Sequence, residues 1–237
     1  MIEEVVGGLA VLALLGIFLY WQLGIAEGAY LGRKVVIWLY DWIAPRYDRV
    51  KQFNPALDSV MLGMPILKHL NRTVGSHSPS ARVLDVATGT GRLPDTLMVQ
   101  SNFAGHITAI DLSRRMLAIG EAKLSRYGDR ITWLCEDASH LPFHDDYFDV
   151  VTSLEALEFL PDTRQALLEM VRVLKPEGLL IVTNRVGPDA WKIPGRTQST
   201  SALMAWLENH GVREAQRDTW LIDYDLIQAI KQSKHKE

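Results

Sequence analysis

The alternation of two kinds of segment from Ala81 to the C-terminus constrains the fold of this chain most strongly. Short runs of β-branched and apolar residues are followed by longer segments with helical spacing, which is typical of a doubly wound, mainly parallel α/β sheet. In such a sheet the ligand site lies at the carboxyl ends of the strands. We expect seven strands, at residues 81–87, 106–111, 131–137, 147–154, 179–186, 212–218 and 220–230, and helices at 94–100, 113–128, 163–175 and 201–211.

The first turn from strand to helix reads DVATGTGRLP over residues 85–94. Gly89 and Gly91 allow the backbone to approach a ligand closely, and the start of the following helix presents free N–H groups. Pro94 falls in the first turn of that helix, where its missing N–H does little harm. Because the glycines directly follow a strand that ends with Asp85, the pattern indicates a cofactor-binding turn.

This turn resembles that of the class I S-adenosylmethionine (SAM)-dependent methyltransferases, and within them the menaquinone and ubiquinone biosynthesis C-methyltransferases. That branch commonly has D-x-A-x-G-T-G here, which Asp85, Ala87, Gly89, Thr90 and Gly91 match. Similar motifs follow in the family's order over the rest of the chain, and WIAPRYD resembles the family's N-terminal signature. These segments are WIAPRYD (42–48), IDLSRRML (110–117), EDASHLPF (136–143), FDVVTSLEALEFLPD (148–162) and VLKPEGLLIVTN (173–184).

The resemblance implies a SAM site in which Asp111 holds both ribose hydroxyls, while Asp137 and Ala138 bind the adenine. It also implies that the N-terminal signature, with Tyr47, helps to close over the cofactor. The complete set of implied cofactor-binding residues is Tyr47, Asp85, Ala87, Thr88, Gly89, Gly91, Asp111, Leu112, Met116, Asp137, Ala138, Ser153 and Leu154.

The residue chemistry favours SAM over a dinucleotide. A cationic sulfonium with a ribose diol and no phosphate needs acceptors, and Asp85, Asp111 and Asp137 place three carboxylates at successive strand ends. A nicotinamide- or flavin-dependent oxidoreductase is the alternative enzyme, since Asp111 follows Gly91 by 20 residues. Pro94 stands where that fingerprint has its third glycine, and Asp85 would lie beside a pyrophosphate, so both oppose it.

Glu155 follows the expected fourth strand, where methyl acceptors approach the cofactor in the resembled family. The quinone-pathway members tend to have an asparagine-containing sequence here, whereas this chain has SLEALEF. Glu155 is therefore our candidate catalytic base, with cofactor orientation and helix capping as alternatives. The acceptor atom, carbon, oxygen or nitrogen, stays open, and so does a SAM-binding scaffold or sensor without turnover. The implied reaction is an in-line displacement that demands no metal.

Composition limits the other classes of function. The formal net charge of −3 argues against nucleic acid as a partner, because phosphate-backbone binding usually needs a broad cationic surface. Cys135 is the single cysteine, which excludes a disulfide framework or a multi-cysteine zinc site within one chain.

The N-terminal part contains 19 residues without a charge, from Val5 to Leu23. This length matches the hydrocarbon core of a bilayer and predicts a single transmembrane helix. Glu3 and Glu4 precede it, and a signal peptide would instead have positive charge there. Basic residues follow it soon, so we expect the catalytic domain on the cytoplasmic side. These basic residues are Arg33, Lys34, Arg46, Arg49 and Lys51.

We expect three parts in the chain: the tail and transmembrane helix (1–30), a basic amphipathic extension with a linker (31–80), and the methyltransferase domain (81–237). Residues 31–80 hold seven Lys or Arg against three Asp, which suits contact with anionic lipid. Within them, residues 35–48 predict an interfacial or substrate-covering helix, or one that simply packs on the domain. An anchored site favours a small, hydrophobic or lipid-like acceptor.

Overall fold

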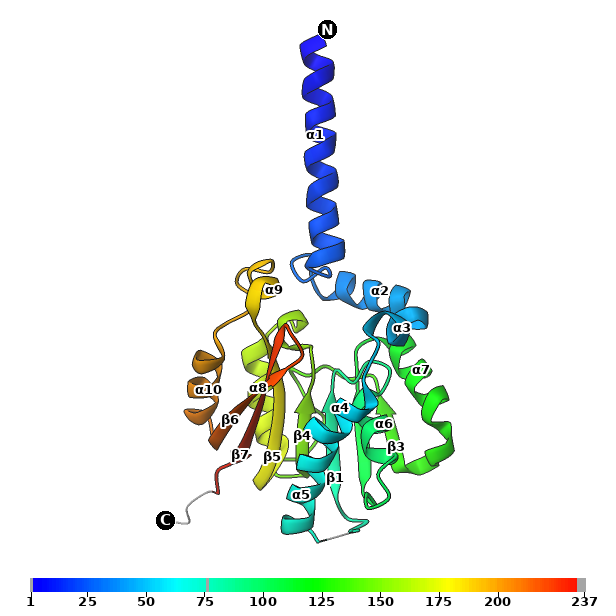
Figure 1. Cartoon of the computed structure of the whole chain (residues 1–237), viewed down its shortest axis with the longest axis vertical. Coiled ribbons are helices and arrows are strands. Elements are labelled where there is room, and N and C mark those ends of the chain that lie inside the picture. The colour runs from blue at the N-terminus through cyan, green and yellow to red at the C-terminus, as the bar shows by residue number, and fades with distance from the viewer. Residues whose placement is uncertain (1, 76, 234–237) are drawn as a thin grey trace.

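The computed structural model describes residues 2–75 and 77–233. A seven-stranded sheet forms its centre, with the strand order β3-β2-β1-β4-β5-β7-β6. All neighbours are parallel except β7, which runs antiparallel to β5 and β6. The predicted doubly wound, mainly parallel sheet is therefore confirmed (Figure 1). Its strands are β1 (Arg82–Val86), β2 (His106–Ile110), β3 (Ile131–Leu134), β4 (Phe148–Ser153), β5 (Leu174–Arg185), β6 (Val212–Trp220) and β7 (Tyr224–Lys231).

Several strand boundaries differ from the prediction: β3 ends at Leu134 and not at residue 137, so Asp137 lies in the loop after the strand. β5 begins at Leu174, because this residue already pairs with Phe148 of β4 before the main register starts. Trp220 ends β6 and does not start β7, since the reversal falls at residues 221–223, where Leu221 has a left-handed φ of 56°. This hairpin turn lies at the carboxyl edge of the sheet, because Arg185 at the end of β5 pairs with Tyr224.

Helices cover both faces of the sheet and bury two apolar clusters. One cluster places α8 and α10 against β4 and β5, and the other places η3, α5 and α6 against β1 and β2. Burial of these side chains is the main stabilising contribution to such a layered fold. The helices are η3 (Ser59–Gly63), α5 (Met64–Thr73), α6 (Arg92–Met98), α7 (Arg114–Leu124), α8 (Thr163–Val173) and α10 (Thr200–Glu208).

The segment before Ala81 takes part in this core. Leu62, Ile66 and Leu70 are buried in the same cluster as Val83 of β1. Short helices then lead back along the chain to the carboxyl edge of the sheet, where α2 contacts α7. These elements are α2 (Arg33–Ile43), η2 (Ala44–Arg46), α3 (Tyr47–Lys51) and α4 (Pro55–Asp58).

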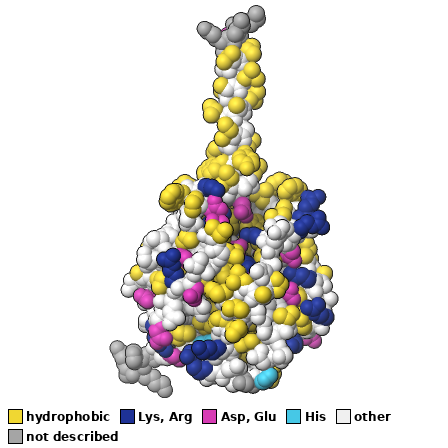
Figure 2. Space-filling view, viewed as in Figure 1, with side chains coloured by type: hydrophobic (Ala, Val, Ile, Leu, Met, Phe, Trp, Pro, Cys, Tyr) yellow, Lys and Arg dark blue, Asp and Glu magenta, His cyan; other side chains and the backbone are white. Residues whose placement is uncertain are grey.

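At its N-terminal end the chain forms a helix that projects away from the globular part. α1 (Ile2–Tyr20) continues into η1 (Trp21–Ile25), and residues 4–20 are exposed along their length (Figure 1). Figure 2 shows hydrophobic side chains along this projection and around its base. Within the described residues, Glu4–Ile25 is the one helix that is long and apolar enough to cross a membrane. The single transmembrane span with a cytoplasmic domain stays a prediction.

Candidate functional site

A cavity of about 760 Å³, including its open mouth, lies at the carboxyl ends of β1, β2 and β4. Its lining includes Ala87, Gly89 and Asp111 from the sheet edge, and residues of α2 lie across from them. A smaller cavity of about 370 Å³ adjoins it and is lined by Asp85, Thr88 and Arg92. Both cavities share Tyr47, Ala87, Gly89, Leu154 and Glu155, so they form two ends of one site.

The glycine turn has a backbone that few residue types adopt. Ala87, Gly89 and Gly91 have φ angles of 56°, 56° and 81°. A Cβ added to Gly91 would lie 2.6 Å from the ring of Trp133, so that position admits only glycine. The hydroxyl of Thr88 donates to Asp85 at 2.6 Å and holds the turn against the strand that precedes it. The turn therefore lies close against the cavity with its backbone exposed to a ligand.

Asp111 and Asp85 both lie at strand ends but have different surroundings. The Asp111 carboxylate accepts the backbone N–H of Gly89 at 2.9 Å and that of Ser113 at 2.8 Å. Burial raises the pKa of Asp111, and these N–H groups partly oppose that shift. Asp85 accepts hydroxyl hydrogen bonds from Thr88 and, at 2.7 Å, from Thr152, while burial raises its pKa to about 6.

The structure places the other implied cofactor residues in two groups. Tyr47, Leu112, Ala138 and Leu154 line the larger cavity together with Asp111. Four residues lie outside the lining of both cavities: Gly91 packs against Trp133, Met116 and Ser153 are fully buried, and Asp137 forms an ion pair with Arg33. The Asp137 carboxylate also accepts the backbone N–H of Ser139 at 2.9 Å.

A substrate-covering helix is one interpretation of residues 35–48 from the sequence, but the residues of α2 that line the cavity are not among the predicted site residues. Arg33, Val36, Ile37 and Tyr40 line it from one face of this helix. Their spacing of i, i+3, i+4 and i+7 is the pattern of a single helix face, so the periodicity of residues 33–40 could have shown it. Phe159, Leu160 and Pro161, after β4, also line the cavity, and no local pattern marks them as lining residues.

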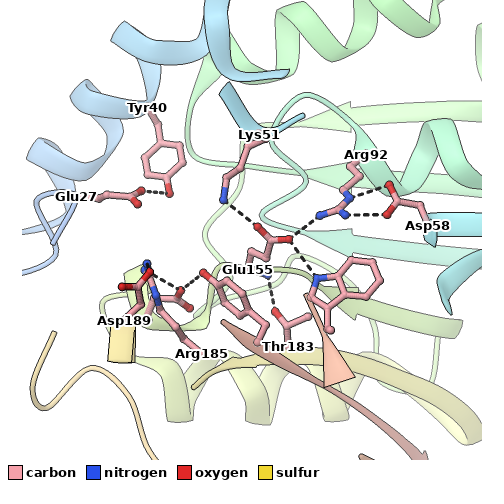
Figure 3. A network of polar contacts seen from close by, with 12 residues as sticks. Glu27, Tyr40, Lys51, Asp58, Arg92, Glu155, Thr183, Arg185 and Asp189 are labelled. Atoms are coloured by element: carbon pink, nitrogen blue, oxygen red, sulfur yellow. Dashed lines mark hydrogen bonds and ion pairs between the residues drawn. The ribbon is translucent and has the colours of Figure 1, made fainter. Parts of the chain in front are cut away.

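Glu155 lies in a buried network of charges (Figure 3). Its Oε2 accepts from Lys51 at 2.8 Å, and its Oε1 accepts from Arg92 at 2.6 Å and from the Trp220 indole at 3.2 Å. The guanidinium of Arg92 also donates twice to Asp58, at 2.9 and 2.7 Å. The backbone N–H of Glu155 donates to the Thr183 hydroxyl, and its φ is 52°. The residue is thus fixed by four different elements.

The charges around Glu155 determine its protonation. Burial alone would raise the pKa of Glu155, but Lys51 and Arg92 beside it lower the pKa below its ordinary value. Both carboxylate oxygens are occupied by cationic donors, so Glu155 is a weak proton acceptor at neutral pH. These contacts favour a positioning role for Glu155 over a role as a base.

Two phenols near this network are held in their protonated form. The Tyr224 hydroxyl donates to Glu158 at 2.5 Å, and the Tyr40 hydroxyl donates to Glu27 at 2.7 Å (Figure 3). Burial raises the pKa of Tyr40 well above its ordinary value, and it also raises the pKa of Glu158. Aromatic rings pack beside the cavity, with centroids 6.1 Å apart for Tyr40 and Tyr47 and 6.0 Å apart for Tyr40 and Phe159.

The described site suits SAM. The Asp111 carboxylate can accept from a ribose diol, the open glycine turn permits close approach of a methionine moiety, and Asp85 adds negative charge toward a cationic ligand. Apolar side chains at the other end of the cavity, including Ile110, Leu112, Ala138 and Leu160, suit an adenine ring. No cluster of basic side chains like that of a pyrophosphate site lines the turn, where Arg92 is already engaged by Asp58 and Glu155.

The fold and the site together resemble those of the class I SAM-dependent methyltransferases. Residues 84–182 match the family described as "Methyltransferase domain". Solved structures with less than 25% identity support the fold. A SAM-dependent methyltransferase from Aquifex aeolicus has a TM-score of 0.54 at 21% identity, covering 76% of this chain and 99% of its own. The phosphoethanolamine N-methyltransferase 2 of Haemonchus contortus, in complex with SAM, has a TM-score of 0.57 at 16% identity, covering 72% and 53%.

Relatives of higher sequence identity come from one branch of this class. The ubiquinone/menaquinone biosynthesis C-methyltransferase UbiE of Geotalea daltonii is 35% identical over 149 residues, which cover 61% of this chain and 60% of that protein. The demethylmenaquinone methyltransferase of Lactiplantibacillus plantarum is 33% identical, with 64% and 62% covered. The predicted resemblance to this branch is confirmed. The chain spans about three fifths of the length of these curated relatives.

Proposed function

We propose that this protein is a SAM-dependent methyltransferase that methylates a carbon of a small quinone-type lipid acceptor. One observation carries the proposal. The cofactor turn, which is rich in hydrogen-bond acceptors, opens into a cavity that is bordered by aromatic side chains. The names of its relatives support the same activity and the same class of acceptor. A SAM-binding scaffold without turnover is the competing function, and only a methyl-transfer assay separates the two.

The chain's own residues would act chiefly by positioning. Bound SAM supplies a methyl group that is already activated by its sulfonium, so orientation provides most of the rate acceleration. Asp111 would hold the ribose, and Asp85 would balance positive charge in the smaller cavity. The ion pairs of Glu155 with Lys51 and Arg92 would fix the segment after β4, which forms one wall of both cavities.

The wall facing Asp111 suits a planar, apolar acceptor. Tyr40, Tyr47 and Phe159 supply aromatic surface, and Val36 and Ile37 add aliphatic surface. Burial raises the pKa of Tyr47 to about 12, so its phenol remains a hydrogen-bond donor at neutral pH. Such a wall can stack on an aromatic ring and donate to a ring oxygen without adding charge.

The helix Glu4–Ile25 supports a membrane location for this activity. We propose that it is an uncleaved span with the methyltransferase domain on the cytoplasmic side, where SAM is made. The basic residues that follow it agree with this orientation. The full-length protein should then resist extraction from membranes by alkaline carbonate, and a mature N-terminus after Leu23 would instead identify a cleaved signal sequence.

The decisive experiment follows a labelled methyl group. Purified full-length protein is incubated with methyl-labelled SAM and with separate lipid and soluble extracts, and the labelled product is identified. We expect label in a quinone-type lipid, and label only in soluble material would contradict the proposed acceptor. Calorimetry on the same protein should show binding of SAM and of its demethylated product but not of NAD. SAM binding without transfer to either extract would favour the scaffold.

A further inference from the structure

Two strongly exposed apolar side chains lie at the carboxyl edge of the sheet. Trp191, at the end of α9 (Gly187–Trp191), is 82% exposed, and Ile222, in the β6–β7 turn, is 91% exposed. Neither exposure is explained by the methyltransferase site, because neither residue lines either cavity. Apolar side chains this exposed on one side of a soluble domain indicate a contact surface.

Hydrogen bonds to backbone carbonyls tie the segment after Trp191 to the base of the apolar helix, and the turn that carries Ile222 to the start of α9. The indole N–H of Trp21 donates to the carbonyl of Lys192 at 2.8 Å, directly after Trp191. The hydroxyl of Tyr30 donates to the carbonyl of Pro194 at 2.6 Å. The β6–β7 turn is joined to the start of α9, because Val186 N–H donates to the Asp223 carbonyl at 2.8 Å. α9, which ends with Trp191, and the β6–β7 turn, which contains Ile222, therefore lie on the side of the domain from which α1 projects (Figure 1).

α2 adds two more aromatic side chains on this side. Trp38 and Trp42 are each 59% exposed and lie opposite the face of α2 that lines the cavity. This follows from helical geometry, since Val36, Ile37 and Tyr40 face the cavity and residues about half a turn away face outward. Lys34, one turn before Trp38, adds a basic group to the same outer side.

We propose that Trp38, Trp42, Trp191 and Ile222 form a membrane-contact surface that lies against the bilayer around the base of α1. The partner is the headgroup and upper acyl region of the bilayer, because the only apolar element leaving this side is the helix that can span a membrane, among the described residues. Tryptophan is favoured at this depth, since its ring is apolar and its N–H is polar. The inference rests on the proposed membrane span.

This surface would fix the orientation of the active site toward the membrane. Trp21 and Tyr30 already tie the helix base to the segment after α9, and contacts of this surface with the bilayer would further restrict the tilt of the domain relative to the membrane. The cavity lies beneath α2, whose outer face belongs to the surface, so its mouth would be held close to the headgroups. A lipid acceptor would then have a short path from the bilayer to the site.

The test measures lipid contact directly in the full-length chain. Cys135 is the only cysteine, so a Cys135→Ser background allows single labels at Ile222→Cys and at a matched control, Val99→Cys. Val99 is 60% exposed at the end of α6. Each variant carries an environment-sensitive fluorophore and is reconstituted into phosphatidylcholine–phosphatidylglycerol vesicles with and without brominated acyl chains. We expect quenching of the Ile222 probe to exceed that of the Val99 probe about threefold or more.

A second label at Trp191→Cys keeps the test decisive if the variant at Ile222 misfolds. Equal quenching at the surface and control positions, in protein that resists alkaline carbonate, would overturn the surface while leaving the span intact. Release of the protein from the membrane by alkaline carbonate would overturn both the contact surface and the membrane span. If the fluorescence of the label changes with protein concentration but is not quenched by brominated lipid, the surface would instead contact a second copy of the chain. Lipid contact without methyl transfer would support the surface and contradict the proposed function.

Discussion

The two ends of the candidate site are built in different ways. The cofactor turn includes contacts within a short stretch of chain, such as Thr88 with Asp85, three residues apart, and a contact between Gly89 and Asp111, 22 residues apart. The Glu155 network joins residues far apart in sequence: Lys51 is separated from Glu155 by 104 residues, Arg92 by 63 and Trp220 by 65. The cofactor end thus combines local contacts with contacts between neighbouring strand ends, such as Thr152 with Asp85, whereas the other end also needs the segment before β1 and the β6–β7 hairpin.

This difference also concerns charge. At the cofactor end, carboxylates are buried with neutral donors, so they remain available to a cationic ligand. At the other end, every described carboxylate bonded to Arg92 or Lys51 is neutralised within the protein. The first arrangement suits binding, and the second suits a rigid wall. Substitutions at the two ends should therefore affect different measurements.

Removal of Arg92 should have the largest effect, and it should fall on stability. Arg92→Met leaves the buried carboxylates of Glu155 and Asp58 without their shared cation, so we expect the free energy of unfolding to fall by ~3–5 kcal/mol. Denaturant unfolding of the full chain measures it. Arg126→Met is the matched control. Arg126 is exposed, and its ion pair with Asp95 is long, at 3.8 Å, so this variant should leave the free energy of unfolding unchanged. Equal stability of the two variants would show that the network is not a structural wall.

Neutralisation of Asp85 should raise the free energy of unfolding, whereas removal of Arg92 should lower it. The pKa of Asp85 in the folded protein is about 6, above its ordinary 3.8, so the folded state binds more protons than the unfolded state between these values. The free energy of unfolding therefore falls as pH rises through that window. Asp85→Asn should raise the stability of the ligand-free protein at pH 8 by up to ~3 kcal/mol, and should weaken SAM binding.

The control for Asp85 is a buried carboxylate that forms an ion pair with a lysine. Asp149 accepts from Lys175 at 2.7 Å, so Asp149→Asn should lower stability by leaving the lysine unpaired. Unfolding at pH 5 and pH 8 separates the cases, because only the Asp85 variant should show a smaller decline in stability with rising pH. A decline of unchanged size in Asp85→Asn would mean that another group titrates there.

Loss of Asp111, which we propose binds the ribose, should affect SAM binding most. Asp111→Ala should weaken SAM binding by about 5- to 150-fold, which corresponds to ~1–3 kcal/mol, because a buried partner is deleted. Calorimetry measures the dissociation constant. Asp137→Ala is the comparison, and its effect should be smaller, since that carboxylate is paired with Arg33 and lies outside the lining. Unchanged affinity in a folded Asp111 variant would remove this residue from the ribose site.

The same difference between the two ends of the site explains which parts of the structure can be predicted from the sequence. The sheet, the glycine turn and the position of Asp111 depend on strand periodicity and on residues a few positions apart, so the sequence predicts them. The pairing of Lys51 with Glu155 joins the end of α3 to the segment after β4, and no local pattern specifies that contact. Trp220 shows the same limit, because its assignment to β6 depends on the turn at 221–223 and on its cross-strand partner Tyr224.

Glu155 provides the finest test of the comparison, and its effect should be the smallest. If Glu155 were the base, Glu155→Gln would lower turnover by ~100-fold or more while SAM affinity stayed near wild type. Because Lys51 and Arg92 lower the pKa of Glu155 and occupy both its oxygens, we expect kcat to fall by less than about tenfold. We also expect a loss of stability, since the amide leaves two cations with less compensation.

The pH profile of kcat/KM decides between the roles. A positioning residue leaves the profile between pH 6 and 8 unchanged in shape, and loss of an ionisation from that profile in Glu155→Gln would restore the base.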